Sequence, residues 1–163
     1  MTKRKLFRAT DGYSAADMLR YARDHFSAAQ HLYRARFEYF DSAAYLAHLA
    51  VEILLKACLL HLSGAFSDTH ILRDLVKDIR NAGGRFDLAN SDEMALYLLD
   101  YFAASRYPVP AAPVQVGSAD LATISAFWNH CVSQLPADLV AAYEGLPAGV
   151  KGGRQLMVKN AAS

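Results

Sequence analysis

Apolar residues recur every three or four positions along most of the chain, which is the spacing of one face of an α-helix. In the first such stretch Leu19, Ala22 and Phe26 share a face, and Arg20 and Arg23 lie on the other side. The same spacing returns in the later stretches. It predicts helices at about 15–35, 41–62, 69–82, 92–105 and 119–135, and a short sixth helix from Pro136 to about Gly145.

The expected helix ends follow from capping residues and glycines. Small polar residues stand directly before four of the predicted helices and are the expected N-caps: Ser14, Asp68, Ser91 and Ser118. Gly64 follows the second helix and Gly83 follows the third, where a left-handed residue commonly ends a helix.

The second helix is apolar on nearly every side, which predicts a buried helix at the centre of the domain. Its polar or amphipathic positions are Asp41, Tyr45, His48, Glu52 and Lys56. At 100° per residue these positions fall within an arc of about 80°. The central helix therefore carries one narrow polar stripe.

The predicted fold class is all-α: an up-and-down helical bundle of five to six helices. The 163 residues fit one domain, with a polar N-terminal lead-in at 1–13, the bundle at 14–145 and a flexible, glycine-containing C-terminal tail at 146–163. The longest uninterrupted apolar runs are too short to cross a bilayer, so no membrane association is expected.

Composition narrows the class of protein further. Hydrophobic residues make up 53% of the chain, which excludes a disordered protein. The formal net charge of +1 excludes a general attraction to nucleic acid but leaves room for a local basic patch. Cys58 and Cys131 lie in apolar helical contexts, which predicts buried free thiols. Together with the lack of a signal peptide, this predicts a cytoplasmic protein.

The polar stripe is the strongest candidate for chemistry. Glu52 precedes Lys56 by four residues, the favourable orientation for an ion pair on a helix. One interpretation is a structural salt bridge at the edge of the core. The other is that the stripe, with His48 and Tyr45 as secondary members, lines a ligand-binding groove, because charged groups rarely stay in apolar surroundings without a partner.

Two further segments carry candidate ligand contacts. Arg106 and Tyr107 stand at a proline-rich break in the chain, where they either cap and plug the fold or present a cation and a stacking ring to a ligand. His70 opens the third helix and is either structural or a hydrogen-bond donor to an anion. We expect Glu52, Lys56, His70, Arg106 and Tyr107 to converge on one groove beside the central helix.

Metal and covalent chemistry find no support in the sequence. None of the six histidines forms an H-E-x-x-H pair, and no C-x-x-C occurs. No G-x-S-x-G elbow is present. We therefore expect no metal site, no cofactor and no catalytic nucleophile.

Three segments taken in order resemble the HEPN domain family, named for higher eukaryotes and prokaryotes nucleotide-binding. They are the central-helix run Tyr45–Ala57 with its A-x-E-x-x-L-K-A pattern, the turn Thr69-His70-Ile-Leu, and the element Arg106-Tyr107-Pro108. The resemblance covers about residues 15 to 140. It implies an all-helical bundle that is commonly a homodimer. It also implies a role as a partner of minimal nucleotidyltransferases in toxin–antitoxin modules, or as a metal-independent ribonuclease.

The ribonuclease branch of that family has an arginine, then four to six arbitrary residues, then a histidine, normally on a late helix. His130 is the late histidine here, but Thr123, Ile124 and Ser125 occupy the positions where the arginine would stand. Arg20 and His25 have the spacing on the first helix, where residues five apart point about 140° from each other. This departure argues against ribonuclease activity.

The sequence favours a non-catalytic HEPN-like binding or interaction module. Its ligand or partner would be a nucleotide, an RNA end or a nucleotidyltransferase. The alternatives are a ribonuclease toxin with a displaced active site and a purely structural dimeric subunit. A homodimer is expected because the first and fifth helices offer more aromatic residues than a small bundle hides: Tyr13, Tyr21, Phe26, Phe127 and Trp128.

Overall fold

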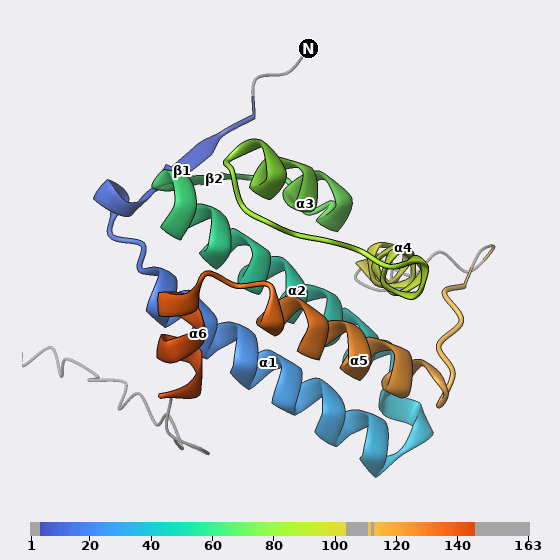
Figure 1. Ribbon diagram of the computed structural model, residues 1–163. Coiled ribbons are helices and arrows are strands. Elements are labelled where there is room, and N and C mark those ends of the chain that lie inside the picture. Colours follow the sequence, from blue (N-terminus) through green and yellow to red (C-terminus); the bar gives the residue numbers. More distant parts are fainter. Residues whose placement is uncertain (1–3, 104–110, 112, 146–163) are drawn as a thin grey trace, which may run out of the picture.

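The computed structural model describes residues 4–103, 111 and 113–145. These residues form six α-helices and one small antiparallel sheet (Figure 1). The helices are α1 (Ala15–Ala35), α2 (Phe40–Ser63), α3 (Leu72–Asn81), α4 (Asn90–Phe102), α5 (Asp120–Ser133) and α6 (Ala137–Glu144). The strands are β1 (Leu6–Arg8) and β2 (Ala65–Ser67), and two short 3-10 turns cover Ala9–Asp11 and Phe37–Tyr39. The predicted all-α class is confirmed.

The central helix is α2, as its sequence predicted. It contacts α1, α3, α4 and α5, and most of its residues are buried. By length and composition it is apolar enough to cross a membrane, but 78% of its apolar window is buried inside the protein. This is the burial of a core helix in a soluble domain, and Gly64 ends it with a φ of 74°, the left-handed conformation that glycine adopts without strain.

The helices are not all aligned. In Figure 1, α1 and α2 run antiparallel side by side and α5 lies along them, whereas α4 is seen end-on. Helix α4 therefore crosses the other helices and does not run antiparallel to α3. The crossing brings the last turns of α4 against both α2 and α3, which matters for the polar stripe described below.

Helix α3 begins later than the sequence predicted, and the cause is the sheet. After Gly64 the chain extends into β2, which pairs with β1 in the register Phe7 opposite Phe66. The backbone N–H of Asp68 donates to the carbonyl of Lys5 over 3.0 Å, so Asp68 prolongs the extended pairing and does not cap a helix. Part of the expected polar lead-in is thus an ordered strand.

Two other expected caps are replaced by acids inside the first turn. The carboxylate of Asp92 accepts the N–H of Ala89 over 2.9 Å at the start of α4, and Asp120 accepts the N–H of Gly117 over 2.8 Å before α5. Ser91 and Ser118 therefore do not cap their helices. Ser14 does, because its hydroxyl accepts the N–H of Asp17 over 3.3 Å.

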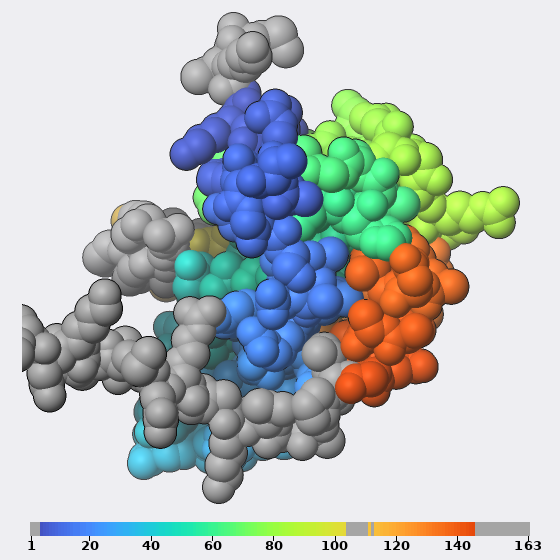
Figure 2. Space-filling model, turned by 90° about the vertical axis from the view of Figure 1, so that its left-hand side faces the viewer, coloured from blue at the N-terminus to red at the C-terminus, as the bar shows by residue number. Residues whose placement is uncertain are grey.

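The N-terminal residues cover one end of the bundle. Phe7 stacks on Phe66 with ring centroids 5.4 Å apart, and Tyr13 meets both rings edge-on. Figure 2 shows this N-terminal segment (blue) against the end of α2 and the β2 region (green), with α6 (orange-red) flanking α1. The expected flexible tail at 146–163 lies outside the described residues.

Three of the aromatic residues expected to form a dimer surface are instead in the core. Phe26 of α1 stacks on Trp128 of α5 with ring centroids 4.3 Å apart, and both are buried, as is Phe127. Only Tyr13 and Tyr21 of that set stay exposed. The aromatic argument for a homodimer is therefore wrong for those three residues, because the docking of α5 on α1 satisfies them within one chain.

Candidate functional site

The C-terminal half of the polar stripe on α2 is buried. His48, Glu52 and Lys56 lie one helical turn apart and are each less than a tenth exposed. Tyr45, one turn earlier, is partly exposed, and no hydrogen bond in the described part of the chain joins it to the others. Three titratable side chains thus share one buried strip of the central helix, where an unpaired charge would be costly.

Glu52 is the hub of this strip. Its Oε1 atom accepts a hydrogen bond from Lys56 Nζ over 2.7 Å and another from His70 Nδ1 over 3.0 Å. Its Oε2 atom lies 3.4 Å from His48 Nε2. The four residues His48, Glu52, Lys56 and His70 are hereafter the Glu52 cluster. It contains one carboxylate and three basic groups.

The surroundings of Glu52 fix its charge. Burial alone would raise the pKa of its carboxyl group. The hydrogen bonds from its three basic partners and the charge of Lys56 outweigh burial, and they lower the pKa from 4.5 to about 2. Glu52 is therefore an anion at neutral pH, so it orients its neighbours and does not serve as a general acid.

His48 joins the cluster to α4. Its Nδ1–H donates to the backbone carbonyl of Leu99 over 2.9 Å, so its two ring nitrogens face acceptors on two different helices. Lys56 has a second neighbour as well, since its Nζ lies 5.7 Å from the centroid of the Phe66 ring. These contacts place the cluster where α2, α4 and β2 meet.

His70 is the one member of the cluster that reaches the surface. Its side chain is 66% exposed, whereas that of Glu52 is 7% exposed. Because Nδ1 donates to Glu52, the ring is held from one side and Nε2 is the nitrogen left for another group. Nε2 accepts a hydrogen bond in the neutral ring and donates one in the imidazolium form. A buried carboxylate therefore positions an exposed imidazole.

Asp100 is a member of this region that the sequence did not reveal. Its Oδ1 accepts the N–H of Leu72, the first residue of α3, over 2.7 Å, and its Oδ2 accepts Arg73 Nε over 3.3 Å. It thus caps α3 from a neighbouring helix and fixes the segment that carries His70. No local sequence pattern predicts such a cap, because Asp100 lies 28 residues after Leu72, the helix start that it caps.

Of the five residues expected to converge on one groove, the structure brings Glu52, Lys56 and His70 into hydrogen-bond contact. Arg106 and Tyr107 lie outside the described residues.

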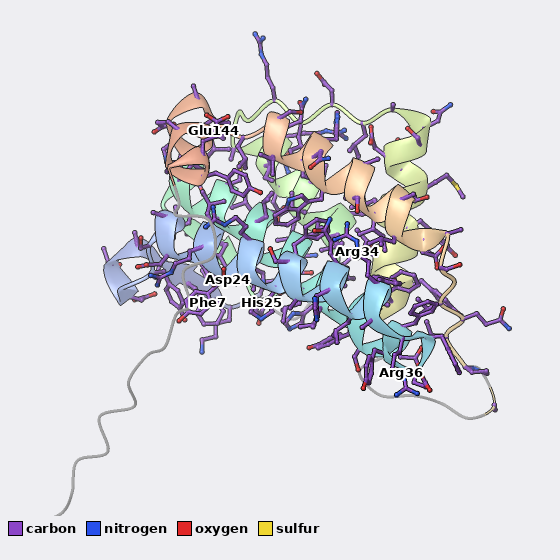
Figure 3. The ribbon with its side chains drawn as sticks, turned by 90° about the horizontal axis from the view of Figure 1, so that it is seen from below. Phe7, Asp24, His25, Arg34, Arg36 and Glu144 are labelled. Carbon is purple, nitrogen blue, oxygen red and sulfur yellow. The ribbon has the colours of Figure 1, made fainter. Side chains whose placement is uncertain are left out.

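The other arginine and histidine residues considered for catalysis form contacts outside the Glu52 cluster. Arg20 pairs with Asp17 over 3.1 Å. His25, labelled on α1 in Figure 3, has its Nδ1 atom 2.7 Å from the carbonyl oxygen of Tyr21 in the same helix. The ring of His130 donates from Nε2 to the carbonyl of Asp87 over 2.6 Å. The arginine and the two histidines weighed for the ribonuclease motif thus hold local structure and form no common site.

Metal and thiol chemistry are not supported by the described residues. Among them, no group of three or more His, Cys, Asp or Glu side chains is placed to hold a metal ion. Cys58 and Cys131 are free and buried, as predicted. Burial raises the pKa of the Cys58 thiol to about 11 and that of Cys131 well above its usual value, so neither is a ready nucleophile.

The fold and the site together define a small all-α domain built on a central helix with a buried acid and its basic partners. Comparison with protein families places it more closely: the sequence matches the family model described as HEPN domain over residues 15–125, from the start of α1 into α5. The chain therefore belongs to the HEPN domain family. No curated protein and no solved structure gave a significant match.

Proposed function

We propose that this HEPN domain is a non-catalytic binding module that holds a phosphate-bearing ligand, a nucleotide or an RNA end, beside the Glu52 cluster. Membership of the family indicates a function related to nucleotides or RNA. The observation that carries the proposal is the exposed imidazole of His70, held by a buried carboxylate that is itself anchored by Lys56. A purely structural ion pair does not require the exposed third member.

In this proposal the side chains have different tasks. His70 Nε2 contacts a phosphate oxygen, and Lys56 adds a positive charge behind it. Glu52 orients both and does not touch the anion. Arg106 would hold the phosphate through its forked donors, and Tyr107 would stack on a base.

Ligand-dependent thermal stability tests this proposal. Millimolar ATP, GTP, AMP or a 5′-phosphorylated RNA trinucleotide should raise the melting temperature of the wild-type protein. A ligand present at about 100 times its dissociation constant adds roughly 2.7 kcal/mol, which is on the order of 5–10 °C for a chain of this size. His70→Ala and Arg106→Ala should abolish this rise while leaving the melting temperature without ligand nearly unchanged.

His31→Ala is the matched control, since His31 is an exposed histidine of α1 outside the cluster. It should keep the full ligand-dependent rise. The proposal fails if no probe shifts the wild-type melt and Arg106→Ala unfolds the protein. In that case Glu52, Lys56 and His70 form a structural network only.

The absence of ribonuclease activity is a separate expectation. General acid–base cleavage needs a histidine beside a cation that holds the phosphate. His25 and His130 are instead bonded to backbone carbonyls. Single-stranded RNA incubated with the pure protein and a chelator should stay intact on a denaturing gel. RNA degradation that disappears in His25→Ala or His130→Ala would show that the domain is an enzyme.

The proposal extends to the localisation, oligomeric state and partner of the protein. We propose a cytoplasmic homodimer that works with a nucleotidyltransferase partner in a toxin–antitoxin-like pair. The two free, buried thiols support a reducing compartment. The exposed aromatic side chains of Tyr13 and Tyr21 line a hollow of about 400 Å³, together with the apolar side chains of Met18 and Ile53. This hollow supports a self-contact on this side of α1.

A further inference from the structure

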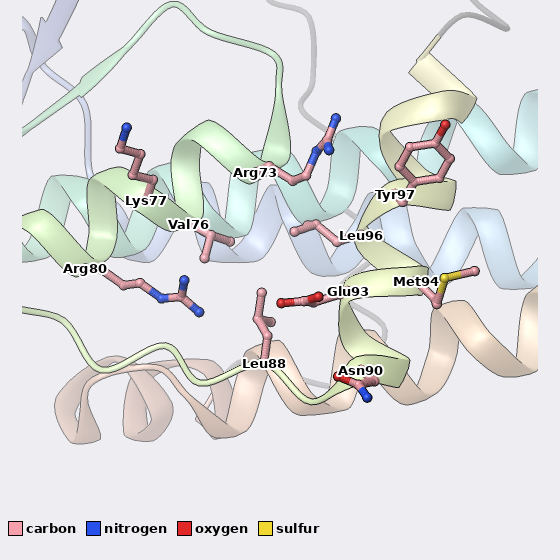
Figure 4. Close-up of a pocket in the computed structure, with 10 residues that line it drawn as sticks. All are labelled: Arg73, Val76, Lys77, Arg80, Leu88, Asn90, Glu93, Met94, Leu96 and Tyr97. Atoms are coloured by element: carbon pink, nitrogen blue, oxygen red, sulfur yellow. The ribbon is translucent and has the colours of Figure 1, made fainter.

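A groove of about 610 Å³ lies between α3 and α4, and no member of the Glu52 cluster lines it (Figure 4). Val76, Leu88 and Leu96 supply apolar side chains from α3, the following loop and α4. A hollow of this size and character takes a few large apolar side chains or a small ligand.

Basic residues line the α3 side of the groove. Arg73, Lys77 and Arg80 are spaced four and three residues apart, which puts them on one side of the helix. Glu93 is the one carboxylate among the lining residues, and in Figure 4 it extends toward Arg80. Lys77 is exposed and has no hydrogen bond or ion pair within the described part of the chain. The groove therefore carries an excess of positive charge.

The α4 side of the groove is an apolar ridge. Met94 is 68% exposed and Tyr97 is 60% exposed, and both also line an adjoining hollow of about 300 Å³ that continues to Tyr101. Arg73 lies over the Tyr97 ring, 5.5 Å from its centroid. Exposed apolar side chains that adjoin in this way mark interaction surfaces.

We propose that the groove between α3 and α4 binds an acidic amphipathic helix of a partner protein. The inference rests on the proposed function as an interaction module but uses a surface separate from the Glu52 cluster. The basic row from Arg73 to Arg80 covers eight residues of α3, roughly 10 Å of helix. That length matches about two turns of a bound helix that runs along α3. Its acids meet the basic row, and its apolar face enters the groove and meets the ridge of α4 where α4 crosses α3.

Charge complementarity favours an acidic helix over three other possible occupants of the groove: the chain's own residues 146–163, a second copy of the chain, and RNA. The chain's own residues 146–163 include Lys151, Arg154 and Lys159 and no acid, so they do not complement a basic row. A second copy related by a two-fold axis through the groove would bring Lys77 against its own equivalent, which like charges disfavour. RNA bases would stack on Tyr97, but they would leave Val76, Leu96 and Met94 without apolar partners, and the phosphates would meet Glu93.

Selection from a peptide library tests the proposal on the full-length protein. Random helical 16-residue peptides are displayed and selected on the wild-type chain, and the enriched peptides are titrated by fluorescence anisotropy. Enriched sequences should combine Asp or Glu with apolar residues spaced three and four apart. Lys77→Glu and Tyr97→Ala should each weaken their binding tenfold or more, with melting temperatures that stay close to that of the wild type.

Arg34→Glu is the matched control, because Arg34 is an exposed cation of α1 that lines no part of the groove (Figure 3). It changes the net charge by the same amount and should leave binding unchanged. Lys77→Glu should also keep the nucleotide-dependent melting shift, so failure of the groove is separable from failure of the Glu52 site.

Five results would overturn the proposal. The first three are a selection that enriches no peptide, enriched peptides without acids, and binding that Lys77→Glu leaves intact. The fourth is a fall in dimer mass by analytical ultracentrifugation in Tyr97→Ala, which would make the ridge a contact between two copies of this chain. Binding of single-stranded RNA that is lost in Lys77→Glu would assign the groove to nucleic acid instead.

Discussion

Replacement of Glu52 by alanine is expected to destabilise the protein by about 3–5 kcal/mol, the range found when one partner is removed from a buried ion pair. The loss is large because Lys56 and His48 stay buried after their shared anion is gone. Chemical denaturation followed by circular dichroism measures it. Glu52→Gln keeps the shape of the side chain and one acceptor, so it should cost less than Glu52→Ala.

Glu38→Ala is the control for this comparison. Glu38 pairs with Arg36 over 2.8 Å, but both side chains are well exposed, so the pair should contribute at most about 1 kcal/mol. If Glu52→Ala lowers the unfolding free energy no more than Glu38→Ala does, the carboxylate of Glu52 does not stabilise the three basic groups around it.

The stability contributed by Glu52 should also decrease when the pH is lowered into the acidic range. Its folded-state pKa of about 2 lies below the ordinary value of 4.5. The contribution is therefore fully present above pH 4.5 and is lost as the pH falls toward 2. The difference in unfolding free energy between wild type and Glu52→Ala should therefore shrink as the pH falls from about 4.5 toward 2.

Phe26→Ala is the second change with a large expected effect, about 3–5 kcal/mol, because it empties a buried site against Trp128. The stacked pair joins α1 to α5, and Trp128 Nε1 also donates to the hydroxyl of Tyr143 in α6 over 3.3 Å. Since Trp128 is the single tryptophan of the chain, its fluorescence reports unfolding directly.

Phe37→Ala removes a ring that is 76% exposed and should cost less than about 0.5 kcal/mol. The cost of Phe26→Ala should not depend on protein concentration, because the ring packs within one chain. A cost that grows on dilution would place Phe26 at a subunit contact and would contradict the observed packing.

The parts of the fold that sequence predicted well are those set by local pattern. Each of these patterns lies within a single helix, so it can be recognised without knowing which elements pack against that helix. They are the periodicity of α1, the apolar character of α2 on all sides, and the end of α2 at Gly64. The start of α3 is not local, because it depends on β2 pairing with β1 some sixty residues earlier. The burial of Phe26 likewise requires knowing that α5 docks on α1.

The same distinction holds for the candidate site. The four-residue spacing of His48, Glu52 and Lys56 predicts their common side of α2, and the structure shows them linked. The contact of His70 with Glu52 was inferred from the order of segments, since no helical spacing joins them. The sequence does not predict the contacts of Asp100 and of the Leu99 carbonyl. They depend on the crossing of α4 over α2 and α3, and no local sequence pattern indicates that crossing.

The central claim is that the Glu52 cluster presents His70 to a phosphate-bearing ligand, and side-chain NMR of the histidines tests it most directly. The full-length protein is labelled with ¹⁵N at histidine and titrated to millimolar concentration with ATP, GTP, AMP and a 5′-phosphorylated RNA trinucleotide. At least one probe should shift the Nε2 resonance of His70, while the buried ring of His48 shifts little and His31 does not shift. Unchanged His70 resonances with every probe, or equal shifts at His31, would contradict the central claim.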